Sequence, residues 1–284
     1  VRVSAYDLKL ADPGASKRLR DHASAHKVTL HDSAAAVSGD SEVVVSAVTA
    51  SQTVEAARSA ALGLKPGCYF LDFNSASPSA KKLASQLVEA RGARYVEAAV
   101  MTSVPPYRIK VPMLLGGAHA AELAGRISAL GFSCQVASEK LGVASATKMC
   151  RSVVIKGMEA MIIESLSAAR HYGVEDAVLA SLAETFPGMD WERQANYFFQ
   201  RVIQHGRRRS EEMFESAQTM REAGLAPYSA LGTAQRQAWM SEISDAGVFG
   251  SRADIGFAQN VDWRVQADRL LAHGTRIAGD LSGS

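Results

Sequence analysis

The strongest constraint on the fold is a change in residue pattern near residue 142. Before it, short β-branched or aromatic runs alternate with segments whose apolar residues recur at helical spacing, as at residues 54–62 and 79–90. This alternation predicts βαβ units around a parallel sheet, with strands near residues 2–6, 42–47, 69–72, 94–99, 113–115 and 133–136. After Gly142 a helical pattern runs from residue 144 to 170, and no convincing strand follows. We therefore expect an α/β domain with a parallel sheet at residues 1–137, followed by an all-α domain at residues 138–284.

The composition excludes several classes of partner. The chain has 284 residues, with 31 Lys and Arg against 29 Asp and Glu, and its net charge of +2 is too small to indicate a nucleic acid or a membrane as partner. Its three cysteines, Cys68, Cys134 and Cys150, show no CxxC spacing, so neither a disulfide framework nor a cysteine-rich zinc site is expected. No apolar run approaches the roughly 18 residues of a membrane span, and the first residues do not resemble a signal peptide. These features predict a cytoplasmic protein.

Asp7 directly follows the first expected strand. An acidic residue at the carboxyl end of the second strand of a dinucleotide-binding (Rossmann-like) sheet is placed to accept both ribose hydroxyls of NAD, and it repels the 2′-phosphate of NADP. Lys9 softens that repulsion, so NAD is favoured and NADP stays possible as the cofactor. Without this context, an aspartate at the end of a strand is more often a turn residue.

Three more expected strands end in small polar loops. Residues 46–52, with Thr49 and Ala50, and residues 72–78, with Asn74 and Ser75, both lead from an apolar strand into a helix. Ligands bind at the carboxyl ends of parallel strands in open α/β sheets, although the same residues also serve as helix caps. Residues 97–108 form a proline-stiffened loop with exposed donors, which suits an anionic substrate or is a plain loop.

Lys148 is the strongest candidate for catalysis. It lies about two turns into the helix that begins after Gly142, and helical spacing places Lys148, Ser152 and Lys156 on one face with Glu159 nearby. Partial burial of a lysine there would lower its pKa toward the range of a proton shuttle. The alternative interpretation is a solvated stripe on an amphipathic helix.

At these residues the chain resembles the β-hydroxyacid dehydrogenase family, within the 6-phosphogluconate dehydrogenase-like superfamily. The family's segment G-x-x-G-x-G-x-x-x-K-x-x-x-N matches at Gly142 and Lys148, with Glu139, Ala144 and Ser152 at its other fixed positions. The family's substrate segment, D-x-x-x-G-A-P-V-S-G-G, is similar to residues 97–103 only loosely, and its aspartate-then-Ser/Thr-x-x-Pro element is similar to residues 72–78. The order of elements agrees over nearly the whole chain.

The resemblance implies a role for each matching residue. Lys148 would be the general acid–base for the substrate oxygen while hydride moves to or from a nicotinamide. Thr102 and Ser103 would bind the substrate carboxylate, and Ser152 would hold the substrate where the family uses an asparagine. Asn74 and Ser75 would lie near the nicotinamide ribose, and Asp7, Thr49 and Ala50 would contribute to the remaining cofactor site. No metal is implied.

The family also has a lysine–aspartate pair on a later helix. Gap-free spacing places Glu211 and Glu212 at these positions, so the lysine is not kept. His205, Arg208 or Arg209 would replace its positive charge, although consecutive arginines on a helix cannot all face one site. The family resemblance and the long apolar helix also imply a homodimer.

The glycine-rich turn of a dinucleotide-binding fold, G-x-G-x-x-G, does not occur in residues 1–284. That turn follows the central strand of the sheet, where its backbone amides approach the pyrophosphate. If the resemblance holds, we expect a strand, turn and helix of about 25–35 residues to precede Val1.

The sequence thus predicts an NAD(P)-dependent oxidoreductase acting on a small hydroxy acid, with or without a phosphate group. The main alternative is a non-catalytic dinucleotide-binding or sensing protein of the same fold, and a minor one is an imine reductase. His22 and His26 have the i, i+4 spacing of metal ligands but lack a third partner. Cys150 is more consistent with a small buried hydrophobe than with a nucleophile.

Overall fold

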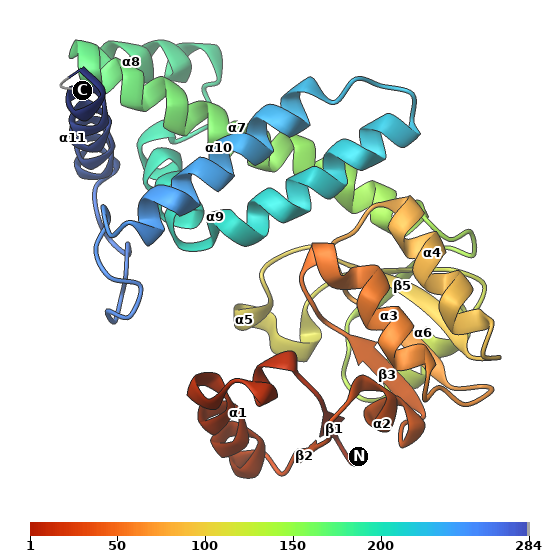
Figure 1. Cartoon of the computed structure of the whole chain (residues 1–284). Helices are drawn as coiled ribbons and strands as arrows, with labels where there is room; N and C mark the ends of the chain where they lie inside the picture. Colours follow the sequence, from red (N-terminus) through yellow and green to blue (C-terminus); the bar gives the residue numbers. More distant parts are fainter. Residues whose placement is uncertain (283–284) are drawn as a thin grey trace. The chain divides into compact units, whose positions relative to one another are not determined.

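The computed structural model describes residues 1–282, and its contacts divide the chain into an α/β unit, Val1–Met149, and a helical unit that starts at Cys150 (Figure 1). The sequence pattern puts the change between the two at residue 138. In the structure, the first turns of the long helix α7 (Val143–Tyr172) group with the α/β unit.

The α/β unit is built on a five-stranded sheet of order β3-β4-β5-β6-β7. Its strands are β3 (Val43–Ser46), β4 (Tyr69–Asp72), β5 (Arg94–Val100), β6 (Met113–Gly116) and β7 (Cys134–Ser138). β3, β4 and β5 are parallel, β6 runs antiparallel to β5, and β7 is parallel to β6. The parallel α/β class is confirmed, with one antiparallel junction that the hydrophobic pattern does not reveal.

Helices cover both faces of this sheet. On one face, α3 (Thr53–Ala61) and α4 (Pro78–Glu89) pack their buried residues against Phe70 and Tyr95. On the other face, α6 (Ala120–Ser128) packs against Tyr69 and Leu71. This packing follows from the alternation of side chains along each strand, and Pro78 and the Ser77 N-cap explain where α4 begins.

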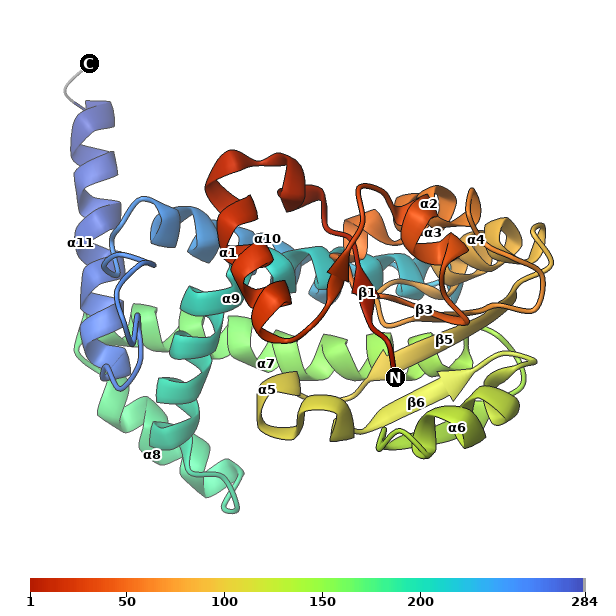
Figure 2. The same cartoon turned by 90° about the horizontal axis from the view of Figure 1, so that it is seen from below.

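Residues 1–31 form a small part of this unit with a strand pair of their own (Figure 2). Its two parallel strands, β1 (Ser4–Ala5) and β2 (Thr29–Leu30), pair only with each other and are joined through η1 (Leu8–Ala11) and α1 (Pro13–Ala25). The strand expected at residues 2–6 is therefore present but only two residues long. α2 (Ala34–Gly39) then leads to β3; η2 (Ala50–Gln52), α5 (Val104–Tyr107) and η3 (Arg108–Lys110) complete the unit's elements.

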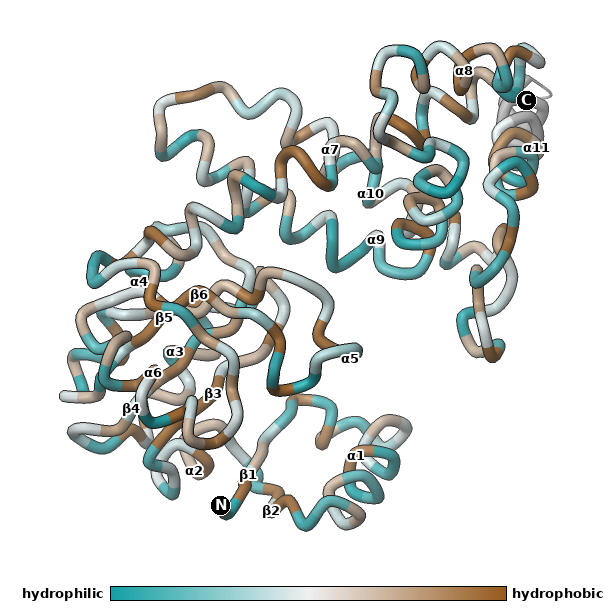
Figure 3. Tube along the Cα trace, turned by 180° about the vertical axis from the view of Figure 1, so that it is seen from behind, coloured by the Kyte–Doolittle hydropathy of each residue, from teal (hydrophilic) through white to brown (hydrophobic). Residues whose placement is uncertain are grey.

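The helical unit consists of α7 from Cys150 onward with α8 (Glu175–Thr185), α9 (Trp191–Glu222), α10 (Tyr228–Asp245) and α11 (Trp263–Ser282). Hydropathy changes repeatedly along α7 and α9, as expected of amphipathic helices (Figure 3). α9 and α10 approach closely at Gly206, which has no side chain. A Cβ at this position would lie only 2.6 Å from the carbonyl oxygen of Gln237. Within the described residues, none of the helices has the length and apolar character needed to cross a bilayer.

Candidate functional site

β4 and β5 each place an acidic side chain in the interior, Asp72 at the carboxyl end of β4 and Glu97 in the middle of β5. Asp72 and Glu97 are register partners on neighbouring parallel strands, and both are fully buried. A buried carboxylate needs several hydrogen bonds or a cation to offset its loss of hydration. Each of the two carboxylates meets that need in a different way.

Asp72 is held by three groups. The ammonium of Lys81, on α4, lies 2.8 Å from Asp72 Oδ1, and the backbone N–H of Asn74 donates to the same oxygen at 2.9 Å. The Tyr95 hydroxyl donates to Asp72 Oδ2 at 2.6 Å. Lys81 also donates to the Asp72 carbonyl oxygen at 3.1 Å. Burial first, and then the Asp72 charge, raise the pKa of Tyr95 well above its ordinary value, so the phenol stays a donor.

The side chain of Asn74 ties two strand-end loops together. Its Oδ1 accepts a hydrogen bond from the Val48 amide at 2.7 Å, and its Nδ2 donates to Ser46 Oγ at 3.0 Å. Asn74 is buried, so its side chain is engaged with the protein itself.

Ser75 meets the predicted catalytic lysine. The Nζ of Lys148, in the second turn of α7, donates to Ser75 Oγ at 2.6 Å, and both residues are partly buried. Both residues belong to the α/β unit. The structure therefore joins one predicted cofactor residue and the predicted acid–base across 73 positions of sequence.

Glu97 holds the start of α7. Its Oε1 accepts from the amides of Gly142 at 2.7 Å and Ala144 at 3.1 Å, and its Oε2 accepts from the Ser145 amide at 3.3 Å. A carboxylate at this position also interacts favourably with the helix dipole. Gly116 leaves room for it, because a Cβ there would lie 2.5 Å from Glu97 Oε1.

The other predicted cofactor residues have the following positions. Asp7 is exposed, and its carboxylate accepts from the Lys9 amide at 2.8 Å and caps η1, as a turn residue does. Thr49 is exposed in the loop after β3, just before η2, with its hydroxyl 3.2 Å from that of Ser51. Ala50 is buried.

The predicted carboxylate-binding residues follow β5. Thr102 is exposed and Ser103 is partly buried, between the end of β5 and α5. The loop continues through Arg108, which adopts a φ of 53° in the left-handed region that few non-glycine residues enter.

The helical unit contains a cluster of charges that is buried except for the half-exposed Arg208. The Lys156 ammonium donates to Glu212 Oε2 at 2.5 Å, and Arg208 donates to Oε1 of the same carboxylate at 2.5 Å. Arg209 pairs with Glu159, on α7. Burial lowers the pKa of Lys156, while Glu212 opposes the shift. The family's lysine is absent from α9, but Glu212 is paired with a lysine from another helix, Lys156 of α7.

Two further candidates lie in this unit. Ser152 is buried on α7, one helical turn before Lys156. His205 lies on α9 among four guanidinium groups, those of Arg201, Arg208, Arg209 and Arg252. Partial burial and then these charges lower the pKa of His205 from 6.5 to about 4, so the imidazole is neutral at pH 7.

The lowered pKa of His205 predicts a dependence of stability on pH. Between the unfolded pKa of 6.5 and the folded value of about 4, the unfolded chain binds a proton that the folded chain does not. The free energy of unfolding should therefore fall as the pH falls through this window. His205→Gln should remove this part of the dependence in urea unfolding measured at about pH 7 and about pH 5.

The matched control for that experiment is His22→Gln. His22 is an exposed histidine on α1, and it is not one of the residues near the arginines that face His205. An equal response of the two variants would contradict the assignment to His205.

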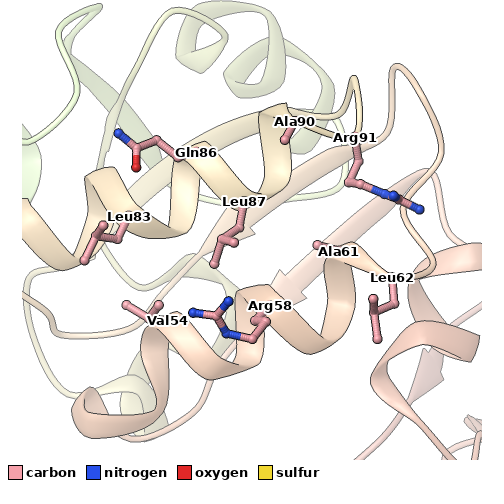
Figure 4. Close-up of a pocket in the computed structure, with 9 residues that line it drawn as sticks. All are labelled: Val54, Arg58, Ala61, Leu62, Leu83, Gln86, Leu87, Ala90 and Arg91. Atoms are coloured by element: carbon pink, nitrogen blue, oxygen red, sulfur yellow. The ribbon is translucent and has the colours of Figure 1, made fainter.

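A shallow groove of about 420 Å³ lies elsewhere on the α/β unit, between α3 and α4 (Figure 4). Its lining residues include Leu62, Leu83 and Leu87 together with Arg58 and Arg91. None of the predicted site residues lines this groove. Within the described residues, there is also no cluster of three or more His, Cys, Asp or Glu with the arrangement of a metal site.

Several of these contacts have no signature in the sequence. Lys81 and Tyr95 are not marked by any motif, and Glu97 is indicated only as part of a substrate loop. The available signal was a charged residue inside an apolar run, since Asp72 follows Tyr69, Phe70 and Leu71 directly. Such a residue requires a partner, but the sequence does not say which one.

Comparison with known proteins gives matches to uncharacterised relatives. A family described as a domain of unknown function, DUF1932, matches residues 169–240. An uncharacterised 28.5 kDa protein of Methanothermus fervidus is 29% identical over 180 residues, which are 62% of this chain and 66% of that protein, just under two thirds of its length.

Two solved structures of uncharacterised proteins are similar to this chain over most of its length. A conserved hypothetical protein of Sinorhizobium meliloti is 38% identical, with a TM-score of 0.70 over 95% of this chain and 87% of that one. A conserved protein of unknown function, MTH1747, described as structurally similar to 3-hydroxyacid dehydrogenases, is 29% identical, with a TM-score of 0.62 over 86% of this chain and 90% of that one.

More distant structures share the fold. The 3-hydroxyisobutyrate dehydrogenase of Mycobacterium tuberculosis, solved with L-serine, is 17% identical, with a TM-score of 0.62 over 95% of this chain and 90% of that one. A reductive aminase of Aspergillus terreus, solved with NADPH and ethyl levulinate, is 17% identical, with a TM-score of 0.51 over 87% of this chain and 86% of that one.

Proposed function

We propose that this chain, which belongs to the β-hydroxyacid (3-hydroxyacid) dehydrogenase family, is an NAD(P)-dependent oxidoreductase that acts on a small hydroxy acid. The observation that carries the proposal is the contact between Lys148 Nζ and Ser75 Oγ at 2.6 Å. It brings a titratable amine to the carboxyl end of β4, where open α/β sheets bind ligands.

Lys148 would act as the general acid–base. In oxidation its neutral amine accepts the proton of the substrate hydroxyl, and in reduction its ammonium returns a proton to the carbonyl oxygen. The nicotinamide cofactor, when bound, supplies or accepts the hydride. Ser75 orients the amine by accepting a hydrogen bond from it, and Glu97 fixes the helix that carries Lys148.

The chain's residues fit such a cofactor at the ends of β3 and β4. Thr49 and Ser75 offer hydroxyls suited to ribose, Ala50 gives close packing without a polar group, and Asn74 fixes the two loops to each other. Asp7 would favour NAD over NADP through its exposed carboxylate.

The substrate would be an anion. Thr102 and Ser103 would bind its carboxylate by hydrogen bonds from the loop after β5. The helical unit contributes three further candidates for substrate contact, Ser152, His205 and Arg208, of which the neutral His205 would supply only a hydrogen bond.

The test is a panel of hydroxy acids and their keto forms, with and without a phosphate group, assayed with NAD(H) and NADP(H) on the full-length protein. We expect a cofactor-dependent change in absorbance with at least one substrate and a rise in melting temperature with the same compounds. Saturable cofactor binding with no turnover on any substrate would contradict catalysis and favour a non-catalytic binding protein. A preference for cyclic imines over keto acids would favour imine reduction instead.

We also propose a homodimer formed through α7. Large apolar side chains on the helix remain exposed, namely Val154 at 61%, Met161 at 63% and Tyr172 at 75%. Exposed apolar side chains along one helix are typical of an interface. A stable monomer in sedimentation equilibrium would contradict this.

A further inference from the structure

The buried ion pair between Lys81 and Asp72 is not explained by a contribution to the stability of the fold alone. Both side chains are almost completely buried, with exposures of 1% and 0%. Removing two charges from water costs several kcal/mol each, and a buried pair is often no more stable than apolar residues of the same size. The pair therefore indicates a need for a defined geometry at this point of the chain.

That geometry concerns the turn after β4. Lys81 binds both the carboxylate and the carbonyl oxygen of Asp72, so it fixes the orientation of the peptide group that leaves the strand. The Asp72 carboxylate then fixes the Asn74 amide, two residues further on. Tyr95, on the neighbouring strand β5, holds the second carboxylate oxygen. The next residue in the turn is Ser75.

We propose that Lys81, Asp72 and Tyr95 are positioning residues that hold Ser75 Oγ against Lys148 Nζ. Their bonds connect the sheet, α4 and the turn in a sequence that ends at the Lys148–Ser75 contact. The catalytic consequence rests on the proposed function of Lys148, whereas the positioning itself does not.

Lys81 has a second effect, which is electrostatic. Its charge neutralises Asp72, so the turn presents no net charge close to Ser75 and Lys148. The network thus fixes the position of the Ser75 oxygen without adding an unpaired carboxylate beside the amine.

The test compares Tyr95→Phe with Tyr69→Phe in the full-length protein. Tyr69 is equally buried, and its hydroxyl accepts a bond of 2.7 Å from Arg94, but it belongs to the core on the opposite face of the sheet. Each variant loses one buried hydroxyl, and only Tyr95→Phe affects Asp72. Asp72→Asn is the second variant of the network.

The readout is the rate at which trace acetic anhydride acetylates Lys148 over a range of pH, quantified by peptide mass spectrometry. Ser75 Oγ accepts a hydrogen bond from the Lys148 amine and so keeps it from reacting freely. When the turn loosens, that hydrogen bond is lost more often and the amine is more accessible, so acetylation should become faster by about fivefold, the factor that corresponds to the loss of one hydrogen bond. The rate in Tyr69→Phe should equal that of the parent protein.

Two results would overturn the positioning role. One is an unchanged Lys148 rate in both Tyr95→Phe and Asp72→Asn, and the other is an equal acceleration in Tyr69→Phe, which would reveal only general loosening. In the kinetic arm, Tyr95→Phe should lower kcat on the order of tenfold with little change in KM, because misplacing a reacting group by about 1 Å is costly. Faster acetylation together with full activity of Lys148→Ala would refute the proposed function and leave the positioning role intact.

Discussion

Replacement of Lys148 by alanine is expected to lower kcat by about 10²–10⁴-fold, the range for loss of a general acid–base, without loss of cofactor binding. The amine contacts Ser75, at the carboxyl end of the strand where the substrate oxygen is proposed to bind. The adjacent backbone does not depend on the amine, because Glu97 independently holds the first turn of α7. Steady-state rates and a cofactor titration on the purified variant would measure the two effects separately.

The control is Lys140→Ala, because Lys140 is an exposed lysine just before α7. It should leave kcat unchanged. The direction of the pH dependence gives a further check, because oxidation needs the neutral amine and should rise with pH, whereas reduction needs the ammonium and should fall. Retention of activity in Lys148→Ala, or the same pH trend in both directions, would contradict the assignment.

The sequence predicted the larger elements of the fold and missed the small ones. The strands β3 to β7 and the helices α3, α4 and α7 lie where hydrophobic periodicity places them. β2 was missed because two residues cannot show an alternating pattern. The antiparallel direction of β6 was missed because side-chain alternation along a strand is the same in both directions.

Those residues of the candidate site that follow from local patterns, such as helical spacing or the end of a strand, were predictable from the sequence. Lys148 and Ser75 were both selected separately, from helical spacing and from a strand end, and the structure places them in contact. Glu97 and Lys81 could not be assigned, since their partners depend on how distant segments pack. Glu97 bonds to amides 45 to 48 positions away.

Glu97→Ala should destabilise the α/β unit by about 3–5 kcal/mol. It leaves the buried amides of Gly142, Ala144 and Ser145 without their acceptor. Each unsatisfied buried donor costs about 1–3 kcal/mol, and the total is reduced where water enters the space left by the side chain. That loss is a large part of the about 5–15 kcal/mol that stabilises a typical domain.

Urea unfolding followed by circular dichroism measures this loss, and hydrogen exchange at the three amides locates it. Glu122→Ala is the control, because Glu122 is a half-exposed carboxylate that pairs with Arg94 at 2.9 Å, and it should cost only about 0–1 kcal/mol. Gly116→Ala should act in the same direction as Glu97→Ala, since its Cβ would lie 2.5 Å from Glu97 Oε1 and displace the carboxylate. If Glu97 holds the start of α7, hydrogen exchange should accelerate first at residues 142–145. An equal acceleration throughout the α/β unit would mean that Glu97 stabilises the sheet as a whole rather than the start of the helix that carries Lys148.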